Sequence, residues 1–274
     1  MQQREVGHNR IHIMNEVNKT LFIPLYGKAQ VSRQKIILND PTAEEIWGAE
    51  QFPIHGKSAS KWLSYNMAMR ARIFDDWTAD MITKNPDAFI FHIGCGLDSR
   101  CRRVKSTYKS WFDCDFPDVI EIRKKYYRES DSYHMITLNA ADPEQVKALP
   151  EAPAAIIILE GISMYLTGDE LRGFFKVLQD KYAKLHILMD VYTVFGAKAS
   201  KYKNPINDVG VTQVYGIDDI EDIIGGLEIH HKAEHSLTPA RLVDELKPAD
   251  RAVFKILFTG KAYSKIYRLH ELEK

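Results

Sequence analysis

The stretch that decides the fold is FIFHIGCGLDSR, residues 89–100. Its first five residues form an apolar run that predicts a buried strand, and Gly94 and Gly96 form a Gly-x-Gly turn before an expected helix. Glycines are needed where the backbone bends sharply and a ligand approaches it at the carboxyl end of a strand. The stretch therefore predicts a nucleotide-cofactor loop, with a plain strand-to-helix connection as the alternative.

Downstream of this loop, short apolar runs alternate with helical segments, which is typical of a parallel sheet with crossover helices. The pattern predicts strands at residues 88–93, 110–114, 134–138, 154–159 and 186–191. It predicts helices between them at residues 99–104, 119–128, 143–149 and 168–181. We therefore expect an α/β, Rossmann-like core with a mostly parallel, seven-stranded sheet.

The C-terminal part predicts an antiparallel edge on this sheet. A helix is expected near residues 217–224 and a strand around 227–231. Two further β-rich stretches, 252–258 and 262–269, are joined by Thr259-Gly260-Lys261, and this tight connection predicts a hairpin. A parallel sheet that ends in an antiparallel pair is common.

The N-terminal residues carry mostly helical signals. Asp40-Pro41-Thr42 is expected to open a helix, and residues 58–84 form a long amphipathic stretch. No repeat or Gly/Pro-rich linker divides the chain, so we expect a single domain over residues 1–274. Within it, residues 1–86 would form a helical cap or lid and residues 87–274 the Rossmann-like core.

Composition argues against several classes of protein. Lys plus Arg and Asp plus Glu are 37 each, which leaves no basic excess for nucleic acid or anionic lipid. Residues 1–10 lack the apolar core of a leader, and the apolar runs are far shorter than the ~20 residues of a membrane span, so a cytoplasmic location is expected. Cys95, Cys101 and Cys114 are too few for a disulfide framework and lack zinc-site spacing.

About 20 residues after the loop, the second predicted strand ends in an acid, Asp115. From this position a carboxylate can accept hydrogen bonds from both hydroxyls of a ribose. Asp113 is less suited because it alternates with apolar residues inside the strand. The alternative is that Asp115 caps a helix begun at Pro117, and the two roles are compatible.

The third position of the loop distinguishes between nucleotides. A dinucleotide pyrophosphate usually requires Gly or Ala there, whereas this chain has Ser99, which disfavours NAD. S-adenosylmethionine carries no phosphate and instead needs polar groups at several strand ends. Asn139 and Ala140 follow the third strand, and Glu160 and Gly161 follow the fourth, where they can face an adenine edge and a cationic group.

Several stretches together resemble a known family. They are residues 20–29 (TLFIPLYGKA), 37–43 (ILNDPTA), 70–75 (RARIFD), 94–100, 115–120 (DFPDVI) and 159–161 with Tyr165-Leu166. In this order they resemble the leucine carboxyl methyltransferase family, in particular its bacterial branch of polyketide-type O-methyltransferases. The resemblance covers roughly residues 15 to 190 and implies a class I methyltransferase fold with S-adenosyl-L-methionine as cofactor.

The resemblance also implies roles for individual residues. Gly94 and Gly96 would contact the methionine part, Asp115 the ribose, and either Arg70 or Arg72 the methionine carboxylate. Asn139 stands where relatives typically carry Asp near the adenine. The full set of expected cofactor-binding residues is Arg70, Arg72, Gly94, Cys95, Gly96, Asp115, Phe116, Asn139, Ala140, Glu160 and Gly161.

The expected reaction is methyl transfer to a carboxylate or hydroxyl of a small molecule. It is an in-line displacement that positioning in a dry pocket can promote, although a hydroxyl acceptor also needs a base. Tyr165 and Tyr192, near strand ends, are the candidate catalytic residues, with simple packing as the alternative. His92 falls inside an apolar strand and is interpreted as a core histidine.

No metal site is expected, because His230, His231 and His235 lack the paired spacing of zinc ligands. Two other functions remain open at this stage. One is an NAD(P)-dependent oxidoreductase, and the other is an S-adenosylmethionine-binding protein without catalysis. The sequence leaves the identity of the acceptor and the oligomeric state undetermined.

Overall fold

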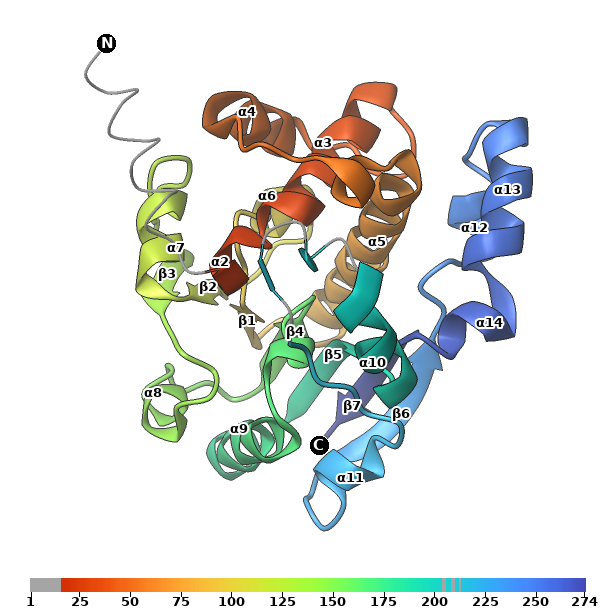
Figure 1. Ribbon diagram of the computed structural model, residues 1–274. Coiled ribbons are helices and arrows are strands. Elements are labelled where there is room, and N and C mark those ends of the chain that lie inside the picture. The colour runs from red at the N-terminus through yellow and green to blue at the C-terminus, as the bar shows by residue number, and fades with distance from the viewer. Residues whose placement is uncertain (1–15, 204–205, 208–209, 212) are drawn as a thin grey trace.

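A computed structural model describes residues 16–203, 206–207, 210–211 and 213–274 (Figure 1). Its centre is a seven-stranded sheet in the order β3-β2-β1-β4-β5-β7-β6. The strands are β1 (Phe89–Ile93), β2 (Ser110–Asp115), β3 (Tyr133–Thr137), β4 (Ala155–Leu159), β5 (Leu185–Tyr192), β6 (His230–His235) and β7 (Tyr267–Glu273). The five N-terminal strands are parallel, as the sequence predicts, and they confirm the expected Rossmann-like core.

Helices cover both faces of the sheet because its central strands are apolar on both sides. In β4, every side chain of the run AIIIL is buried. Ile156 and Ile158 pack in the cluster that includes α5 (Lys61–Lys84), while Ala155, Ile157 and Leu159 pack in the cluster that includes α9 (Gly168–Lys181). This two-sided burial is characteristic of a parallel sheet between helical layers.

The N-terminal helices gather above one end of the sheet, and the last of them, α5, continues from there along one face of the sheet (Figure 1). They are α2 (Glu16–Lys19), α3 (Phe22–Gln34), α4 (Pro41–Glu50) and α5, with a 3₁₀ turn, η1, at Gly56–Ala59. The expected start of α4 is confirmed: Asp40 accepts a hydrogen bond from Ala43 N at 2.9 Å, and Pro41 occupies the first helical position. The division into a cap over residues 1–86 and a core within one domain stays a prediction.

The remaining helices connect the strands. They are α6 (Arg100–Arg103), α7 (Pro117–Arg123), α8 (Pro143–Lys147), a 3₁₀ turn η2 (Ser163–Tyr165), α10 (Val194–Lys203), α11 (Glu221–Ile224), α12 (Ala240–Val243), α13 (Pro248–Phe258) and α14 (Gly260–Ser264). Helix α9 begins with a capping box between Thr167 and Glu170. The predicted crossover helices are therefore present, although several are shorter than expected.

The antiparallel edge of the sheet exists, but different residues form it. Strand β7 is antiparallel to β5 and pairs with β6 at the edge. The predicted strand at 252–258 is wrong, because these residues belong to α13. The predicted hairpin at 259–261 is wrong as well, because Thr259 alone separates α13 from α14. The predicted strand at 262–269 is correct only at its end, where β7 begins, and the strand expected at 227–231 starts three residues later.

The misassigned segment has a physical explanation. Residues 252–258 are rich in apolar residues, which resembles a strand, but Pro248 stands at the first helical turn, where its missing N–H costs nothing. Only one side chain of α13, Phe254, is buried, whereas Ile256 is 80% and Leu257 is 57% exposed. A short apolar run of this length can belong to a strand or to a helix, and its periodicity alone does not distinguish the two.

The sequence predicts neither a membrane-spanning helix nor a leader. Of the helices in the described ranges, none combines the length and the apolar character needed to cross a membrane. The expected lack of a leader concerns residues 1–10, which lie outside the described residues, and a cytoplasmic location stays a prediction.

Beneath the cofactor loop, a buried ion pair joins α7 to β2. The guanidinium of Arg123 donates to Asp113, and both side chains are fully buried. Arg123 also donates to the backbone oxygen of Gly96 at 2.9 Å. Burial alone would raise the pKa of Asp113, but Arg123, helped by His92 and Trp111, outweighs it and lowers the pKa to about 2. The ion pair therefore supports the loop from below.

Replacing Arg123 by Met should destabilise the protein strongly. The substitution leaves the Asp113 carboxylate buried without its cation, so we expect a loss of about 3–5 kcal/mol in the free energy of unfolding. Urea denaturation followed by circular dichroism measures this change. Lys124→Met, at an exposed neighbouring side chain, is the control and should stay within about 0.5 kcal/mol. Equal stabilities of the two variants would contradict the proposed support.

Candidate active site

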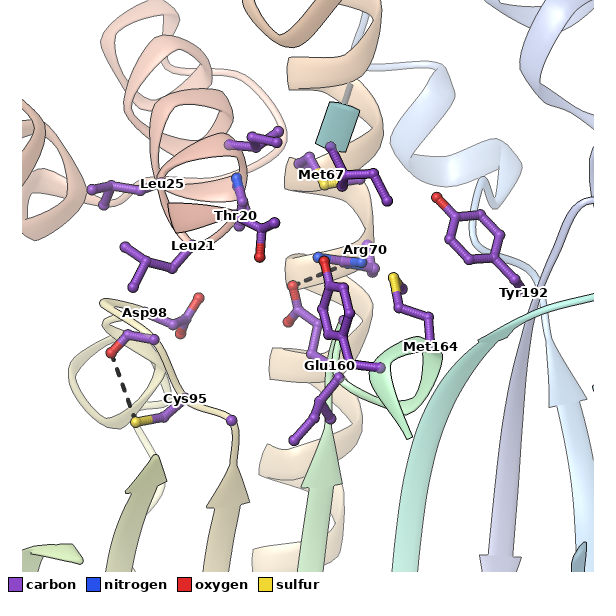
Figure 2. A pocket seen from close by; sticks show the side chains of 18 of the residues that line it. Thr20, Leu21, Leu25, Met67, Arg70, Cys95, Asp98, Glu160, Met164 and Tyr192 are labelled. Atoms are coloured by element: carbon purple, nitrogen blue, oxygen red, sulfur yellow. Dashed lines mark hydrogen bonds and ion pairs between the residues drawn. The ribbon is translucent and has the colours of Figure 1, made fainter. Parts of the chain in front are cut away.

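A large cavity opens at the carboxyl ends of the parallel strands. Its volume is about 790 Å³, within the range of small-molecule sites, and its lining is more apolar than polar. The ends of β1, β2 and β5 and the loops after β1 to β4 line it from the sheet side, and residues of α3, α5, α10 and α14 line it from the other side. Figure 2 shows side chains from these separate elements facing one another across the cavity.

The glycines of the first loop are required by its geometry. Gly94 and Gly96 have φ angles of +66° and +53°, in the region that favours glycine. A Cβ on Gly94 would lie 2.7 Å from Ile162 Cδ1, and one on Gly96 would lie 3.3 Å from Leu21 Cβ. The backbone of this loop is therefore bare where it faces the cavity, as the sequence predicts for a cofactor loop.

Cys95 lies between these glycines and lines the cavity, but its side chain is buried. Burial raises the pKa of its thiol well above the usual value. A reactive thiolate is therefore disfavoured at this position. All three cysteines are free thiols.

The two acids of β2 have different environments. Asp115 lines the cavity and accepts hydrogen bonds from Gly96 N at 2.7 Å and Phe116 N at 2.8 Å. Burial raises the pKa of Asp115 to about 6. Asp113 instead pairs with Arg123 and accepts from the Tyr133 hydroxyl at 2.7 Å. Asp115 does not cap α7, whose N-cap residue is Phe116.

The loop after β4 places a carboxylate against two arginines. Arg70 Nε donates to Glu160 Oε1 at 3.1 Å, and Arg100 donates to Glu160 Oε2. Burial would raise the pKa of Glu160, but the two guanidinium groups, Arg100 first, outweigh it and lower the pKa to about 2. Glu160 is thus a carboxylate at every pH at which the protein is expected to work.

Arg70 is fixed by groups from three strands. Besides Glu160, it donates from Nη1 to Asp190 Oδ2 of β5 at 2.9 Å and to the Tyr267 hydroxyl of β7 at 2.8 Å. Its Nη2 makes no hydrogen bond with the residues that the structure describes. Gly161 lies beside this group with φ +71°, and a Cβ there would come within 3.2 Å of Nη2. The Nη2 amino group of Arg70 therefore remains for a ligand.

Arg72 lies outside the cavity, although the sequence predicts Arg70 and Arg72 as alternative ligands of the methionine carboxylate. Its Nε donates to Asp76 at 2.9 Å, its Nη1 donates to Ile37 O at 3.0 Å, and its side chain is 40% exposed. It is not among the residues that line the cavity. Two positions along a helix turn by about 200°, which is why the two arginines point in different directions.

The loop after β3 completes the sheet side of the cavity. Asn139 and Ala140 both line it. Asn139 Oδ1 accepts a hydrogen bond from Ala141 N at 3.1 Å, and its backbone N–H donates to Gln145 at 2.8 Å. The side chain that replaces the usual Asp is therefore used in part to shape its own loop.

The two tyrosines expected near the reaction also line the cavity. Burial raises the pKa of Tyr165 to about 12, so its phenol stays protonated at neutral pH. The ring of Tyr192 packs against Tyr267 with 4.8 Å between centroids. His92 is 2% exposed, with Nε2 at 3.0 Å from Arg100 Nη1, and burial lowers its pKa, which fits a core histidine.

The histidines near the sheet edge pair with other residues. His235 Nε2 lies 2.6 Å from Glu271 Oε2, and His231 Nε2 lies 3.2 Å from His270 Nδ1. Over the described residues, no group of three or more His, Cys, Asp or Glu side chains is arranged to hold a metal ion.

Sequence reasoning missed several residues that line the cavity or hold its lining in place. Lys28 of α3 forms a buried ion pair with Asp98, and both line the cavity. Arg100 and Asp190 are fully buried and bind Glu160 and Arg70. Asp190 lies near the end of the fifth predicted strand, so the rule that singled out Asp115 and Glu160 would have found it. Lys28 and Tyr267 carry no such local signal.

Comparison with known proteins identifies the family. A family model described as leucine carboxyl methyltransferase matches residues 21–179, more than half of the chain. The chain belongs to this family. The resemblance predicted from the sequence is thereby confirmed, and the protein is an S-adenosylmethionine-dependent methyltransferase. This result sets aside the oxidoreductase alternative.

Two related proteins illustrate the similarity of this methyltransferase to others. The tetracenomycin polyketide synthesis O-methyltransferase TcmP of Streptomyces glaucescens is 28% identical over 244 residues, covering 86% of this chain and 89% of that protein. The S-adenosyl-L-methionine-dependent methyltransferase dpfgK of Gibberella zeae is 26% identical over 170 residues, covering 56% of this chain and 57% of that protein.

Solved structures share the fold at low sequence identity. Magnesium protoporphyrin IX methyltransferase (ChlM) from Synechocystis PCC 6803, with bound SAH, has a TM-score of 0.51 and 10% identity, and the match covers 85% of this chain and 93% of that chain. An S-adenosylmethionine-dependent methyltransferase from Anabaena variabilis has a TM-score of 0.51 and 12% identity, with the same coverage of 85% and 93%. The methyltransferase therefore has the class I fold.

The lining of the cavity fits the cofactor of this family. The bare backbone at Gly94 and Gly96 leaves room for a ligand, Arg70 Nη2 offers a donor to an anionic group, and Asp115 offers carboxylate oxygens to hydroxyls. S-adenosylmethionine supplies a methyl group on a sulfonium, and these residues match its amino acid and ribose parts.

Gly161→Ala should destabilise the methyltransferase. The alanine would have to adopt a φ of +71°, and its Cβ would crowd Arg70. We therefore expect a loss of about 1–3 kcal/mol in unfolding free energy. Gly173→Ala is the matched control, because Gly173 lies inside α9 with open space around it and should gain up to about 1 kcal/mol. Chemical denaturation of both variants tests this, and a stable Gly161→Ala protein would refute it.

Proposed function

We propose that this methyltransferase transfers a methyl group to an oxygen, in a carboxylate or hydroxyl, of a small, largely apolar molecule. The observation that carries the proposal is that the proposed cofactor residues and an apolar, aromatic wall adjoin in one cavity. That wall includes Trp62, Leu63 and Phe258. The description of the Streptomyces glaucescens relative as an O-methyltransferase of polyketide synthesis supports the same class of acceptor.

We infer that the cofactor is held at four strand ends. Gly94, Cys95 and Gly96 would contact the methionine part, and Arg70 would bind its carboxylate through Nη2. Asp115, followed by Phe116, would accept from the ribose hydroxyls, Asn139 and Ala140 would adjoin the adenine, and Glu160 with Gly161 would lie near the cationic centre. Each proposed role matches the charge and hydrogen-bonding capacity of the residue.

Catalysis in this proposal consists of positioning and exclusion of water. In-line displacement requires the acceptor oxygen close to the methyl group, and an enclosed site strengthens the electrostatic interactions within it. Tyr165 and Tyr192 would contact the acceptor, with Tyr165 as a protonated phenol that donates rather than removes a proton. An acceptor carboxylate needs no base, because it is ionised at neutral pH.

The proposed cofactor site can be tested by titration calorimetry with S-adenosylhomocysteine and NAD. We expect binding of the first compound only, accompanied by thermal stabilisation of about 2.7 kcal/mol at ~100 times the dissociation constant. Arg70→Lys, which loses the planar fork, should weaken binding roughly 10-fold to 100-fold. Arg72→Lys is the control and should bind within about twofold of the wild type. Equal effects of both variants would refute the role of Arg70.

The methyl acceptor can be sought with a labelled cofactor. Incubation of the enzyme with S-adenosylmethionine labelled in its methyl group and a panel of aromatic acids and phenols should yield methyl esters or ethers, identified by mass spectrometry. Label recovered only on nitrogen or carbon would contradict an oxygen acceptor.

Cofactor binding should weaken in mild acid because of Asp115. Its pKa is about 6, so below this pH the Asp115 carboxyl group of the free protein is mostly protonated. It must lose this proton before it can accept hydrogen bonds from the ribose as a carboxylate. The dissociation constant of S-adenosylhomocysteine should therefore rise, approaching about tenfold per pH unit below 6. Asp115→Asn should bind more weakly at neutral pH but without this pH dependence. A wild-type affinity that is constant from neutral pH to pH ~5 would contradict the assignment.

A further inference from the structure

A buried amide in the cavity has no part in the proposed cofactor site. Asn66 lies on α5, one helical turn before Arg70, and is 4% exposed. The hydroxyl of Tyr263, on α14, donates to Asn66 Oδ1 at 2.8 Å. Within the described ranges, Asn66 Nδ2 makes no hydrogen bond. The amide oxygen is therefore engaged, while the amide nitrogen has no partner among the described residues.

The unpaired nitrogen opens into the cavity. Asn66 lines the cavity, and its Nδ2 is not one of the fully covered polar atoms without a partner, so it retains accessible surface there. Water can reach this donor in the open cavity, but once an apolar ligand displaces the water, a donor left without a partner costs about 1–3 kcal/mol. A ligand that supplies an oxygen acceptor at this point would remove that cost.

Asn66 lies in the part of the cavity away from the proposed cofactor residues, where the methyl acceptor would bind. Residues four apart on a helix have Cβ atoms about 5–6 Å apart on one face, so Asn66 follows the same face as Arg70. The neighbouring lining residues on α5 are Trp62, Leu63 and Met67, and none of the expected cofactor residues lies on this turn. Figure 2 shows Met67 and Arg70 along α5, with Tyr192 facing them from the other side.

We propose that Asn66 Nδ2 donates a hydrogen bond to a carbonyl or carboxylate oxygen of the methyl acceptor, and that Tyr263 holds the amide in this orientation. The inference rests on the proposed function and makes its acceptor class more specific. Because the Tyr263 hydroxyl occupies the amide oxygen, Asn66 offers a ligand only the N–H groups of Nδ2. The site therefore selects a ligand with a hydrogen-bond acceptor at this point. Burial raises the pKa of Tyr263, which keeps the phenol a donor.

The inference can be tested with two phenols that differ in one oxygen. Para-hydroxyacetophenone carries a carbonyl, and para-ethylphenol has nearly the same shape without it. Calorimetry on the full chain saturated with S-adenosylhomocysteine should show that the wild type binds the ketone about tenfold more tightly, because a site built to bond an oxygen discriminates against an analogue that lacks it. No binding of either phenol, or no preference for the ketone, would overturn the inference.

Asn66→Asp is the decisive variant, because it keeps the shape and the acceptor for Tyr263 but removes the donor. It should lose the preference for the ketone while its affinity for S-adenosylhomocysteine stays within about twofold. Asn85→Asp, at the C-terminal end of the same helix and outside the cavity lining, makes the same change in charge and should keep the preference. A retained preference in Asn66→Asp overturns the inference, as does a large loss of cofactor affinity, which would move the amide to the cofactor site.

Tyr263→Phe provides a second variant with an uncharged substitution. Without the phenol the amide can rotate, so the preference for the ketone should fall about threefold rather than disappear. An unchanged preference would contradict the positioning role of Tyr263. If the wild type fails to bind S-adenosylhomocysteine, the proposed function itself fails, whereas cofactor binding without discrimination between the phenols contradicts only the assignment of Asn66.

Discussion

The buried guanidinium of Arg70 must be surrounded by carboxylates and hydroxyls, and this requirement connects the ends of three strands. Glu160 follows β4, Asp190 lies in β5, and Tyr267 begins β7. An unpaired charge in this place would cost several kcal/mol, so the strand ends and α5 must keep their relative positions. The same restraint leaves Nη2 exposed to the cavity. The cation that stabilises the site is thus also the group proposed to bind the cofactor.

The charges around Arg70 extend from the sheet to the N-terminal helices. Arg100 bonds Glu160 and also Asp75 of α5, and Lys28 of α3 bonds Asp98 in the cofactor loop. These ion pairs are buried, so solvent and salt screen them weakly. They place the helices above the cavity in a defined position on the loop. The roof of the proposed site is therefore tied to its floor by charge as well as by apolar packing.

In the proposed function, one face of α5 binds both ligands, the cofactor through Arg70 and the methyl acceptor through Asn66. Arg70 offers a charged donor next to the cofactor loop, and Asn66 offers a neutral donor one turn away, within an apolar and aromatic wall. A charged group suits the carboxylate of an amino acid, whereas a neutral amide suits a carbonyl or carboxylate oxygen on a largely apolar molecule. Spacing along a rigid helix would then set the distance between the two ligands.

The chemistry of the strand ends was evident from the sequence alone. Apolar runs end directly at or before Gly94, Gly96, Asp115 and Glu160. Because the carboxyl ends of parallel strands meet at one edge of the sheet, this local pattern was enough to predict that the four residues lie close together. Only the tertiary structure could separate Arg70 from Arg72, because packing decides which face of α5 is buried. Helix α13 was misread because a short apolar run can belong to either a strand or a helix.

The partners of Arg70 and Asn66 depended on the tertiary structure for the same reason. Asp190 and Tyr267 stand 120 and 197 positions after Arg70, and Tyr263 stands 197 positions after Asn66. No local periodicity records a contact over such a separation. A sequence reveals what each segment offers at its own end, whereas the pairing of buried charges and amides is decided when the chain folds, since each must find a partner from a distant element.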